Sequence, residues 1–403
     1  YGLYFLAYNL RAGYPYVSYT LSAISFIMLI TVPILTMRSM AEERHSRTDQ
    51  LVLTAPVSLG KMIFGKFLAM VGVFTVAVAV IAVTPLVLAT FGTVPMGENY
   101  VAVLGFWLYG CTCIAVGMLA SALTESQVIA AVVAFAFLFL GYMMNSITGL
   151  IGDHLITKVL GAYDLYTPLQ SFMSGCLDLT GVVYFVSVTG LCLFLTCQCV
   201  QKRRWSMTTK KLTTGMFSVA MIVVGFAVAV AVNMVVKEMP SSWTAVDATS
   251  TKLYSLTDTT KDYVKNLSQD VTIYVLSSEK SADSTLAETL QRYEDLSKHL
   301  KVVYKDPAKS PNFYQQYTDS APSQNSMIVV SDARSRVVDY SDIYEYSYDY
   351  STYSSSVDGY DAEGQLTSAL QYVTKADSEL PVIYEITGHG ENTLSGGFSE
   401  AVE

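Results

Sequence analysis

The chain has 403 residues, of which 52% are apolar and 15% are charged, and its formal net charge is −9. Ordinary globular domains are roughly 45–50% apolar and about 25% charged, so this composition argues against a wholly soluble enzyme, and its apolar content argues against a disordered chain. The acidic balance also disfavours nucleic acid as a partner, because phosphate binding needs a basic surface.

Charge divides the sequence into two unlike halves. Residues 1–236 hold 12 Lys+Arg and 8 Asp+Glu, a net +4, whereas residues 237–403 hold 13 and 26, a net −13. All six cysteines lie in the first half, in apolar surroundings that favour packing roles over metal binding. The sequence therefore predicts a membrane region followed by an acidic, water-exposed domain.

Six stretches of the first half are long and apolar enough to span a membrane, which takes about 20 mostly apolar residues. None of these stretches contains Asp, Glu, Lys, Arg or His. Ion-coupled carriers place such groups within the bilayer, so their absence disfavours ion-coupled transport and indicates an energy source outside the spans. The stretches are residues 17–37, 67–91, 101–123, 127–149, 179–200 and 212–236.

The segments between the spans predict the orientation. Segments 38–66 and 201–211 hold ten Lys and Arg residues. Segments 1–16, 92–100 and 150–178 hold only Arg11 and Lys158. Cytoplasmic loops carry the excess of positive charge, so the two basic segments are predicted to be cytoplasmic. The sixth span then leads outward, and residues 237–403 are predicted to lie outside the membrane.

The segment 38–66 is predicted to form two short helices on the membrane surface, separated by Pro56, although a plain interfacial anchor fits the pattern equally well. Within it, residues 60–67 (GKMIFGKF) nearly match the phosphate-binding motif G-x-x-x-x-G-K-[ST]. Phe67 stands where that motif needs the hydroxyl that holds Mg²⁺, and no buried strand precedes Gly60. The stretch is therefore interpreted as the start of a span and not as a nucleotide site.

Three motifs of this region resemble the permease subunit of gliding-motility-type (GldF-like) ABC transporters: residues 36–44 (TMRSMAEER), 54–58 (TAPVS) and 65–67 (GKF). The resemblance covers residues 1–200 and implies a type-2 ABC permease with six helices, of which the first is largely missing here. Residues 48–50 (TDQ) depart slightly from the Thr-x-Glu of that family.

The resemblance implies that segment 38–58 couples the chain to a separate ATPase subunit. That subunit would bind ATP and Mg²⁺, this chain would hold no cofactor, and the permease would work as a homodimer. Charged side chains of the segment form charge-assisted contacts with the ATPase or pair within the chain, and the sequence leaves both roles open. The residues assigned to coupling are Arg38, Glu42, Glu43, Arg44, Thr48, Thr54 and Pro56.

Strand and helix signals alternate beyond residue 250, which predicts an α/β sheet with helices on its faces. Strands are predicted at 271–276, 301–304, 327–330 and 382–386, and helices at 284–299 and 363–374.

From about residue 212 onward the chain resembles the auxiliary (GldG-like) component of the same transporters. The resemblance is carried by residues 247–249 (DAT), 253–257 (LYSLT), 363–370 (EGQLTSAL) and 388–391 (GHGE). It implies that permease and auxiliary protein are fused in one chain. The span 212–236 is then the anchor of the auxiliary part, and a further membrane helix follows the end of this sequence.

One candidate ligand or partner site comprises His389, Gly390 and Glu391, which directly follow a predicted strand. Open α/β sheets bind ligands beyond the carboxyl ends of their strands. The alternative is a tight glycine turn whose polar side chains cap the next helix.

A second candidate lies in residues 340–360, which hold seven tyrosines among Ser and Asp. Tyr346, Tyr348 and Tyr350 combine an aromatic face with a hydroxyl, which suits contact with a glycan or another polymer. A twisted hairpin with tyrosine on one face explains the run equally well.

The sequence thus predicts a polytopic α-helical membrane protein, a type-2 ABC permease, followed by an extracytoplasmic α/β domain. The predicted divisions are a permease domain (1–200), a cytoplasmic linker with an anchor helix (201–236) and an extracytoplasmic domain (237–403) whose C-terminus is incomplete. The expected location is the bacterial cytoplasmic membrane, and the expected partners are the lipid bilayer, the ABC ATPase and an envelope protein or glycan.

The predicted function is that of the permease subunit of an ATP-driven transporter of the exporter type. One alternative is a mechanotransmission complex that acts on an envelope partner without moving a substrate. Another is an extracytoplasmic enzyme on a membrane anchor, which is disfavoured because the sequence has no H-E-x-x-H or G-x-S-x-G motif.

Overall fold

The computed structural model falls into two compact units, which we describe separately. The first unit comprises Tyr1–Leu256 with Lys280–Asp295, and the second comprises Thr257–Glu279 with Leu296–Glu403. The residues that the structure describes are 1–48, 58–151, 160–201, 211–237, 239, 244–247, 255–278, 281–349 and 354–375.

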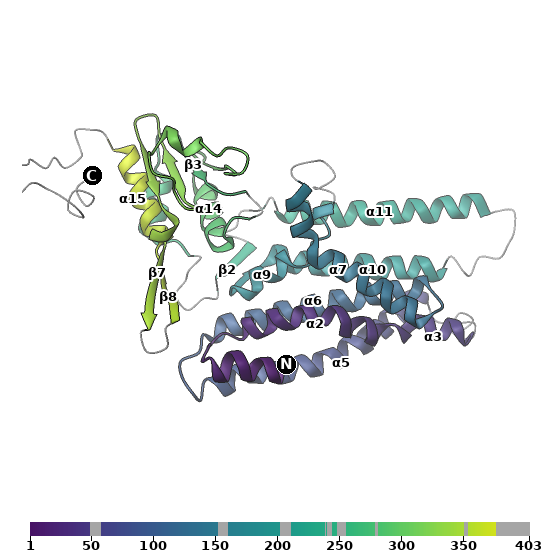
Figure 1. Cartoon of the computed structure of the whole chain (residues 1–403). Coiled ribbons are helices and arrows are strands. Elements are labelled where there is room, and N and C mark those ends of the chain that lie inside the picture. The colour runs from purple at the N-terminus through teal and green to yellow at the C-terminus, as the bar shows by residue number, and fades with distance from the viewer. Residues whose placement is uncertain are drawn as a thin grey trace, which may run out of the picture. The chain divides into compact units, whose positions relative to one another are not determined.

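The first unit is a bundle of long helices (Figure 1). Its helices are α1 (Gly2–Tyr4), the π-helix η1 (Phe5–Arg11), α2 (Val17–Thr36), α3 (Arg38–His45), α5 (Leu59–Leu88), α6 (Met96–Leu123), α7 (Gln127–Ile151), α9 (Thr167–Met173), α10 (Leu179–Gln201), α11 (Lys211–Lys237) and α14 (Ser284–Leu296). A short antiparallel pair, β1 (Cys176–Asp178) with β2 (Ala245–Asp247), completes it.

Six helical segments among the described residues are long and apolar enough to cross a membrane, and the sequence predicts all six. The first runs from Val17 to His45 through both α2 and α3, and the second begins already at Leu59. Both extend beyond the predicted apolar stretches because the flanking polar residues continue the helix. The chain is a polytopic α-helical membrane protein.

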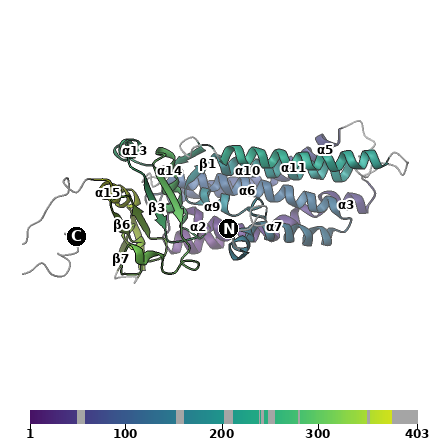
Figure 2. The same cartoon turned by 90° about the horizontal axis from the view of Figure 1, so that it is seen from above.

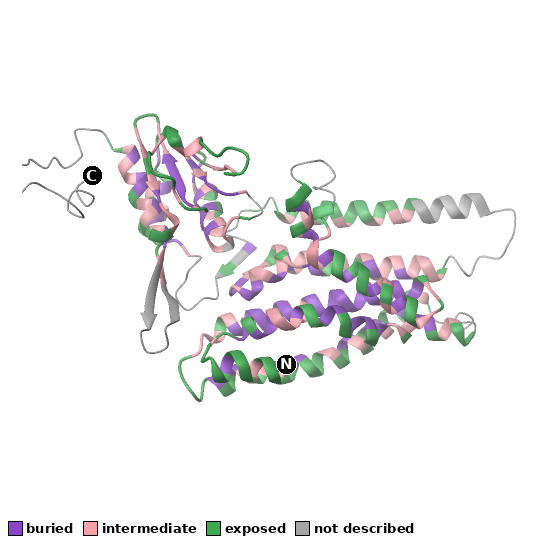
Figure 3. Ribbon diagram, viewed as in Figure 1, coloured by how far each residue is buried: buried purple, intermediate pink, exposed green. Residues whose placement is uncertain are grey.

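Helix α6 lies at the centre of the bundle, packed against α2, α5, α7, α9 and α10. It is buried along most of its length (Figure 3), because small residues face its neighbours at close range. At Gly117 an added Cβ would lie 2.2 Å from Thr36 Oγ1, and at Gly110 it would lie 2.2 Å from the Phe74 ring. No larger residue fits at either contact unless the neighbouring side chain moves.

Helix α11 packs on α10, and the two lie side by side in both views (Figure 2). Asn233 Nδ2 donates a hydrogen bond to Ser187 Oγ across the pair, at 2.7 Å. Gly225 allows the Phe194 ring to approach, since an added Cβ would lie 3.0 Å from it. Between residues 220 and 237, α11 exposes apolar side chains such as Val223, Val228 and Val235, as expected for a helix surrounded by lipid.

The second unit contains a four-stranded mixed sheet in the order β4–β3–β5–β6. Only β3 and β4 are parallel, so the predicted α/β alternation holds for one strand pair and the other pairs are antiparallel. Along β3 the side chains of Val271, Ile273 and Val275 are buried, which marks the covered face. The strands are β3 (Val271–Val275), β4 (Leu300–Tyr304), β5 (Met327–Val330) and β6 (Ser335–Val338).

Helix α15 (Ala362–Thr374) packs on β5 and β6 and contributes Leu366, Leu370 and Val373 to the core. It confirms the helix predicted at 363–374. Two short 3₁₀ helices, η3 (Phe313–Gln316) and η4 (Tyr340–Asp342), follow β4 and β6. The strand predicted at 382–386 lies outside the described residues.

The tyrosine-rich stretch forms an antiparallel strand pair, β7 (Tyr344–Asp349) with β8 (Ser354–Tyr360). Tyr344 lies opposite Tyr360 and Tyr348 opposite Ser355, with an irregularity in the register between Glu345 and Tyr346. This pairing agrees with the hairpin interpretation of the sequence.

Candidate functional site

The helix α3 continues the direction of α2 beyond Met37 and presents two different faces. Arg38, Glu42 and His45 are exposed, and because they are spaced by four and then three residues they share one side of the helix. Met40 and Ala41 on the opposite side are buried against α6. One side of α3 is therefore fixed to the bundle, and the other is a polar surface of alternating charge.

Two of the charged residues predicted for coupling are engaged within the chain. Glu43 forms an ion pair with Lys66 of α5, whose ammonium also donates a hydrogen bond to Ser39 O at 3.1 Å. Arg44 forms an ion pair with Glu125 at 3.0 Å, between Arg44 Nη2 and Glu125 Oε1. Of the two roles that the sequence leaves open for Glu43 and Arg44, the structure shows pairing within the chain.

A serine of α6 holds the point where α2 passes into α3. The Ser121 hydroxyl donates to Met37 O at 3.0 Å and accepts hydrogen bonds from Met40 N–H at 3.1 Å and Ala41 N–H at 3.0 Å. The helical pattern is interrupted at Met37, and a side chain that enters the backbone ladder of a helix is a common cause of such a break. Ser121 is fully buried, so these bonds are shielded from water.

The end of α3 is a tight turn. Ser46 Oγ donates to Glu42 O at 2.9 Å, and Thr48 Oγ1 donates to Glu43 O at 3.3 Å, which satisfies carbonyls of the last helical turn. Arg47 adopts a left-handed conformation with φ of 59°, the backbone state that ends many helices. Thr48 is exposed beside this turn, whereas Thr54 and Pro56 lie outside the described residues.

The stretch that nearly matches a phosphate-binding loop lies within α5. Residues Gly60 to Phe67 are helical, so their backbone N–H groups point along the helix and do not form a phosphate cradle. Lys66, the lysine of the near-match, pairs with Glu43. The structure agrees with the interpretation of this stretch as the start of a span.

The opposite end of the bundle is held by two buried asparagines. Asn99 of α6 accepts a hydrogen bond from Val17 N–H at 2.6 Å and donates to Pro15 O and Pro95 O, both at 3.1 Å. Asn9 of η1 donates hydrogen bonds to two backbone carbonyls in the turn that precedes α2, and its side-chain oxygen accepts one from Thr20 Oγ1 at 2.7 Å. These bonds fix the chain where it enters α2.

The segment around α9 fills the same end. The Phe172 side chain lies so close to Gly105 of α6 and Gly181 of α10 that an added Cβ would meet it at 2.3 and 2.8 Å. Leu165 occupies the space beside Gly141 of α7, and its N–H donates to Gly141 O at 3.0 Å. Glycines from three helices thus admit one inserted segment.

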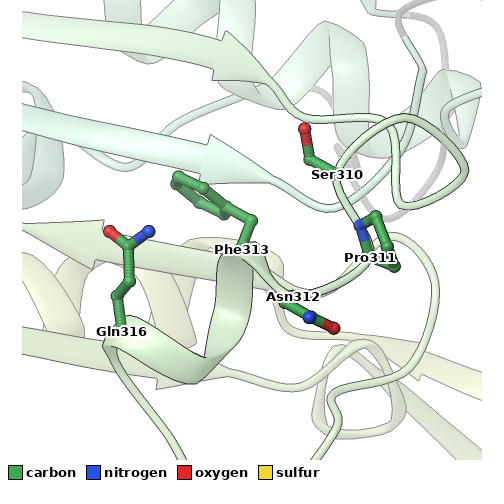
Figure 4. A pocket seen from close by; sticks show the side chains of 5 residues that line it. All are labelled: Ser310, Pro311, Asn312, Phe313 and Gln316. Carbon is green, nitrogen blue, oxygen red and sulfur yellow. The ribbon is translucent and has the colours of Figure 1, made fainter.

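The second unit has a shallow, open recess of about 330 Å³ (Figure 4). It is lined by Ser310, Pro311, Asn312, Phe313 and Gln316 and contains no ionisable side chain. The Lys305 ammonium lies 5.2 Å from the centre of the Phe313 ring. This contact positions the η3 segment beside the end of β4.

A second polar cluster in this unit is structural. The Asp339 carboxylate accepts hydrogen bonds from the hydroxyls of Ser323, Ser326 and Ser341, at 2.6 to 3.1 Å, and from two backbone N–H groups. Partial burial alone would raise the pKa of Asp339, but hydrogen bonds from Ser323 and Ser341 outweigh it and hold that pKa well below its ordinary value. The cluster fastens the loop before β5 to η4.

Two segments that carry the GldG-like resemblance meet in space. The Glu363 carboxylate of α15 accepts hydrogen bonds from Thr257 N–H at 2.8 Å and Thr257 Oγ1 at 2.6 Å, where α13 (Asp258–Lys265) begins. Tyr263 OH and Thr374 Oγ1 lie 2.6 Å apart further along the same helix pair. These residues join α13 to α15, which is a structural role.

Only some of the residues predicted to bind a ligand or partner lie among the residues that the structure describes. Tyr346 and Tyr348 lie on β7, while Tyr350, His389, Gly390 and Glu391 lie outside the described residues. No group of three or more potential metal ligands is present among the described residues. The binding role of these six residues stays a prediction.

Two parts of the chain match known family models. Residues 12–200 match the model described as "ABC-2 family transporter protein", and residues 250–343 match one described as a "domain of unknown function", DUF7088. The first match supports a type-2 ABC permease, a non-catalytic membrane subunit that works with an ABC ATPase. No curated protein and no solved structure matches the chain.

Proposed function

We propose that the chain is the membrane subunit of an ATP-driven transporter of the exporter type, coupled through residues 38–58 to a separate ATPase that binds ATP and Mg²⁺. In this proposal residues 237–403 are an extracytoplasmic GldG-like domain fused to a GldF-like permease, and two copies of the chain form the transport unit. The domain would meet an envelope protein or glycan outside the cytoplasmic membrane.

The exposed face of α3 carries this proposal. Arg38, Glu42 and His45 project from the end of the bundle whose connections are rich in Lys and Arg, which is the cytoplasmic side by the distribution of charge. The opposite charges of Arg38 and Glu42 on one face favour a specific polar partner over a lipid surface. The lack of ionisable residues in the spans also supports an energy source outside them, because it disfavours ion-coupled transport.

Of the coupling residues predicted from the sequence, the proposal selects Glu42 as the one that contacts the partner. Glu42 has no ion pair within the described part of the chain and is exposed, so its carboxylate is available to a partner. Glu43 and Arg44 would act indirectly, by holding α3 in place. Substitution of Glu42 therefore separates partner contact from the internal stability of the segment.

The test is site-specific photo-crosslinking in the cell. A photoreactive amino acid at position 42 is expected to capture a protein with a nucleotide-binding motif, identified by mass spectrometry. The matched control is position 132 on α7, where Val132 is exposed on the apolar surface and should capture lipid only. Capture of the same protein from both positions, or lipid alone from position 42, would contradict the proposal.

A purified complex gives a second readout. Glu42→Ala is expected to reduce the stimulation of the ATPase by the membrane subunit, and Glu42→Ala with Glu43→Ala to reduce it further. Unchanged stimulation and unchanged recovery of the complex in the double variant would remove the coupling role from α3.

A further inference from the structure

We propose that Ser121 is the positioning residue that fixes α3 to the central helix α6, so that a displacement of α3 is passed to α6. The function served by this attachment rests on the coupling role proposed above, whereas the attachment itself does not. Ser121 lies some 80 residues from α3 in the sequence and touches no predicted coupling residue with its hydroxyl.

The first support is the number of backbone groups that one buried hydroxyl satisfies. Ser121 Oγ bonds to Met37 O and to the N–H groups of Met40 and Ala41, so it contacts both sides of the interruption between α2 and α3. Buried backbone groups that lose a partner are costly, because no water replaces the missing bond. The start of α3 therefore follows the position of α6.

A second attachment joins the far end of α3 to the same place. Arg44 Nη1 donates to Ala122 O at 3.4 Å, and Arg44 Nη2 pairs with Glu125. Ser121, Ala122 and Glu125 belong to the end of α6 and the short connection that follows it. Contacts one turn apart along α3 converge on this one segment and resist rotation of α3 about its own axis.

The neighbouring Ser39 supplies an internal contrast. Its hydroxyl is buried at the same joint, yet it has no hydrogen-bond partner within the described residues. The hydroxyl oxygens of both serines are thus buried, but Ser121 Oγ connects helices and Ser39 Oγ does not. Ser39→Ala is accordingly the matched control for Ser121→Ala.

The central position of α6 determines how many helices a displacement of α3 would reach. It contacts α2, α5, α7 and α10, so a small movement at its cytoplasmic end reaches most of the spans at once. Covalent continuity alone would pass a displacement of α3 only to α2. The Ser121 bond adds α6 as the direct recipient.

Hydrogen–deuterium exchange of the full complex, in lipid nanodiscs with its ATPase subunit, tests the attachment. Without nucleotide, Ser121→Ala is expected to speed exchange at the Met40 and Ala41 amides about tenfold, the size of one lost hydrogen bond. Ser39→Ala should leave these rates unchanged. Equal exchange in the two variants would overturn the inference.

Addition of ATP and vanadate then tests transmission. In the unmodified complex, exchange is expected to change in both α3 and α6; in Ser121→Ala the change should persist in α3 and be reduced in α6. An undiminished response of α6 would overturn the inference, whereas a lack of response in α3 of the unmodified complex would contradict the proposed function instead. Should Ser121→Ala fail to fold, Arg44→Gln removes the second attachment, and an undiminished α6 response in it would count against the inference.

Discussion

The two ends of the helix bundle are built in different ways. At one end, Asn99 and the inserted Phe172 hold the chain through buried hydrogen bonds and glycine contacts that leave no spare volume. At the other end, α3 is held by one buried hydroxyl and two ion pairs, of which one extends to the exposed carboxylate of Glu125.

This difference indicates which end is able to move. Tight packing and buried amides resist displacement, because each small shift breaks contacts that nothing replaces. Ion pairs near the surface exchange their partners for water at little cost. The α3 end is therefore the one suited to respond to a partner, and the opposite end serves as the fixed base of the bundle.

The largest effect is expected from Gly105→Leu at the fixed end. The new side chain would overlap Phe172, and overpacking of this kind costs about 3 kcal/mol or more. Thermal unfolding of the purified protein in detergent measures the loss. Gly72→Leu is the control, because an added Cβ at Gly72 meets no atom within 4 Å, and an equal loss in both variants would remove the role of the glycine contact.

A smaller loss, about 2 kcal/mol, is expected for Asn99→Ala, which leaves the buried Val17 N–H without its acceptor. Urea unfolding monitored by tryptophan fluorescence measures it. Asn233→Ala breaks an interhelical bond on the outer helix α11 and should cost less. If Asn99→Ala proved as harmless as Asn233→Ala, the buried Asn99 contacts would not hold their end of the bundle rigidly.

At the α3 end, the pair between Glu43 and Lys66 is expected to contribute about 1 kcal/mol, since both side chains are partly buried. A double-mutant cycle with Glu43→Gln and Lys66→Met isolates that coupling energy. A coupling energy of about 2 kcal/mol, as large as the loss expected for Asn99→Ala, would show that α3 is held as rigidly as the opposite end.

The smallest effect is expected for Arg44 and Glu125, about 0.5 kcal/mol, because 69% of the Glu125 side chain is exposed. The coupling energy should vanish at about 1 M salt, where charges are screened within roughly 3 Å. A cycle with Arg44→Gln and Glu125→Gln at low and high salt measures it, and a salt-independent value would contradict the surface character of this pair.

The sequence predicts those parts of the structure that depend on local pattern. Apolar runs without charge predict the spans, and β-branched runs such as residues 271–276 predict the strands. Each of these patterns lies within one stretch of sequence and can be recognised without knowing what the stretch packs against. The charged residues of α3 are also found by sequence, through their resemblance to a motif. These signals lie within a few turns of one helix or strand.

Contacts between distant residues are not predicted. Nothing in the sequence around Ser121 distinguishes it from other serines of the spans, and its role depends on α6 lying beside α3. In the sequence, Lys66 belongs to a near-match to a nucleotide motif and to the GKF motif, and neither indicates its ion pair with Glu43. Phe172 and Gly105 likewise form a pair only after the helices have packed.

We propose from the distribution of charge that α3 is cytoplasmic and faces an ATPase, and that the sheet domain is extracytoplasmic. Cysteine labelling of intact cells with a membrane-impermeant maleimide tests it directly, using His45→Cys and Gln315→Cys at two exposed positions and the unmodified chain as background. The account predicts that Gln315→Cys reacts in intact cells and that His45→Cys reacts only after the membrane is opened. Labelling of both positions from the same side would contradict it.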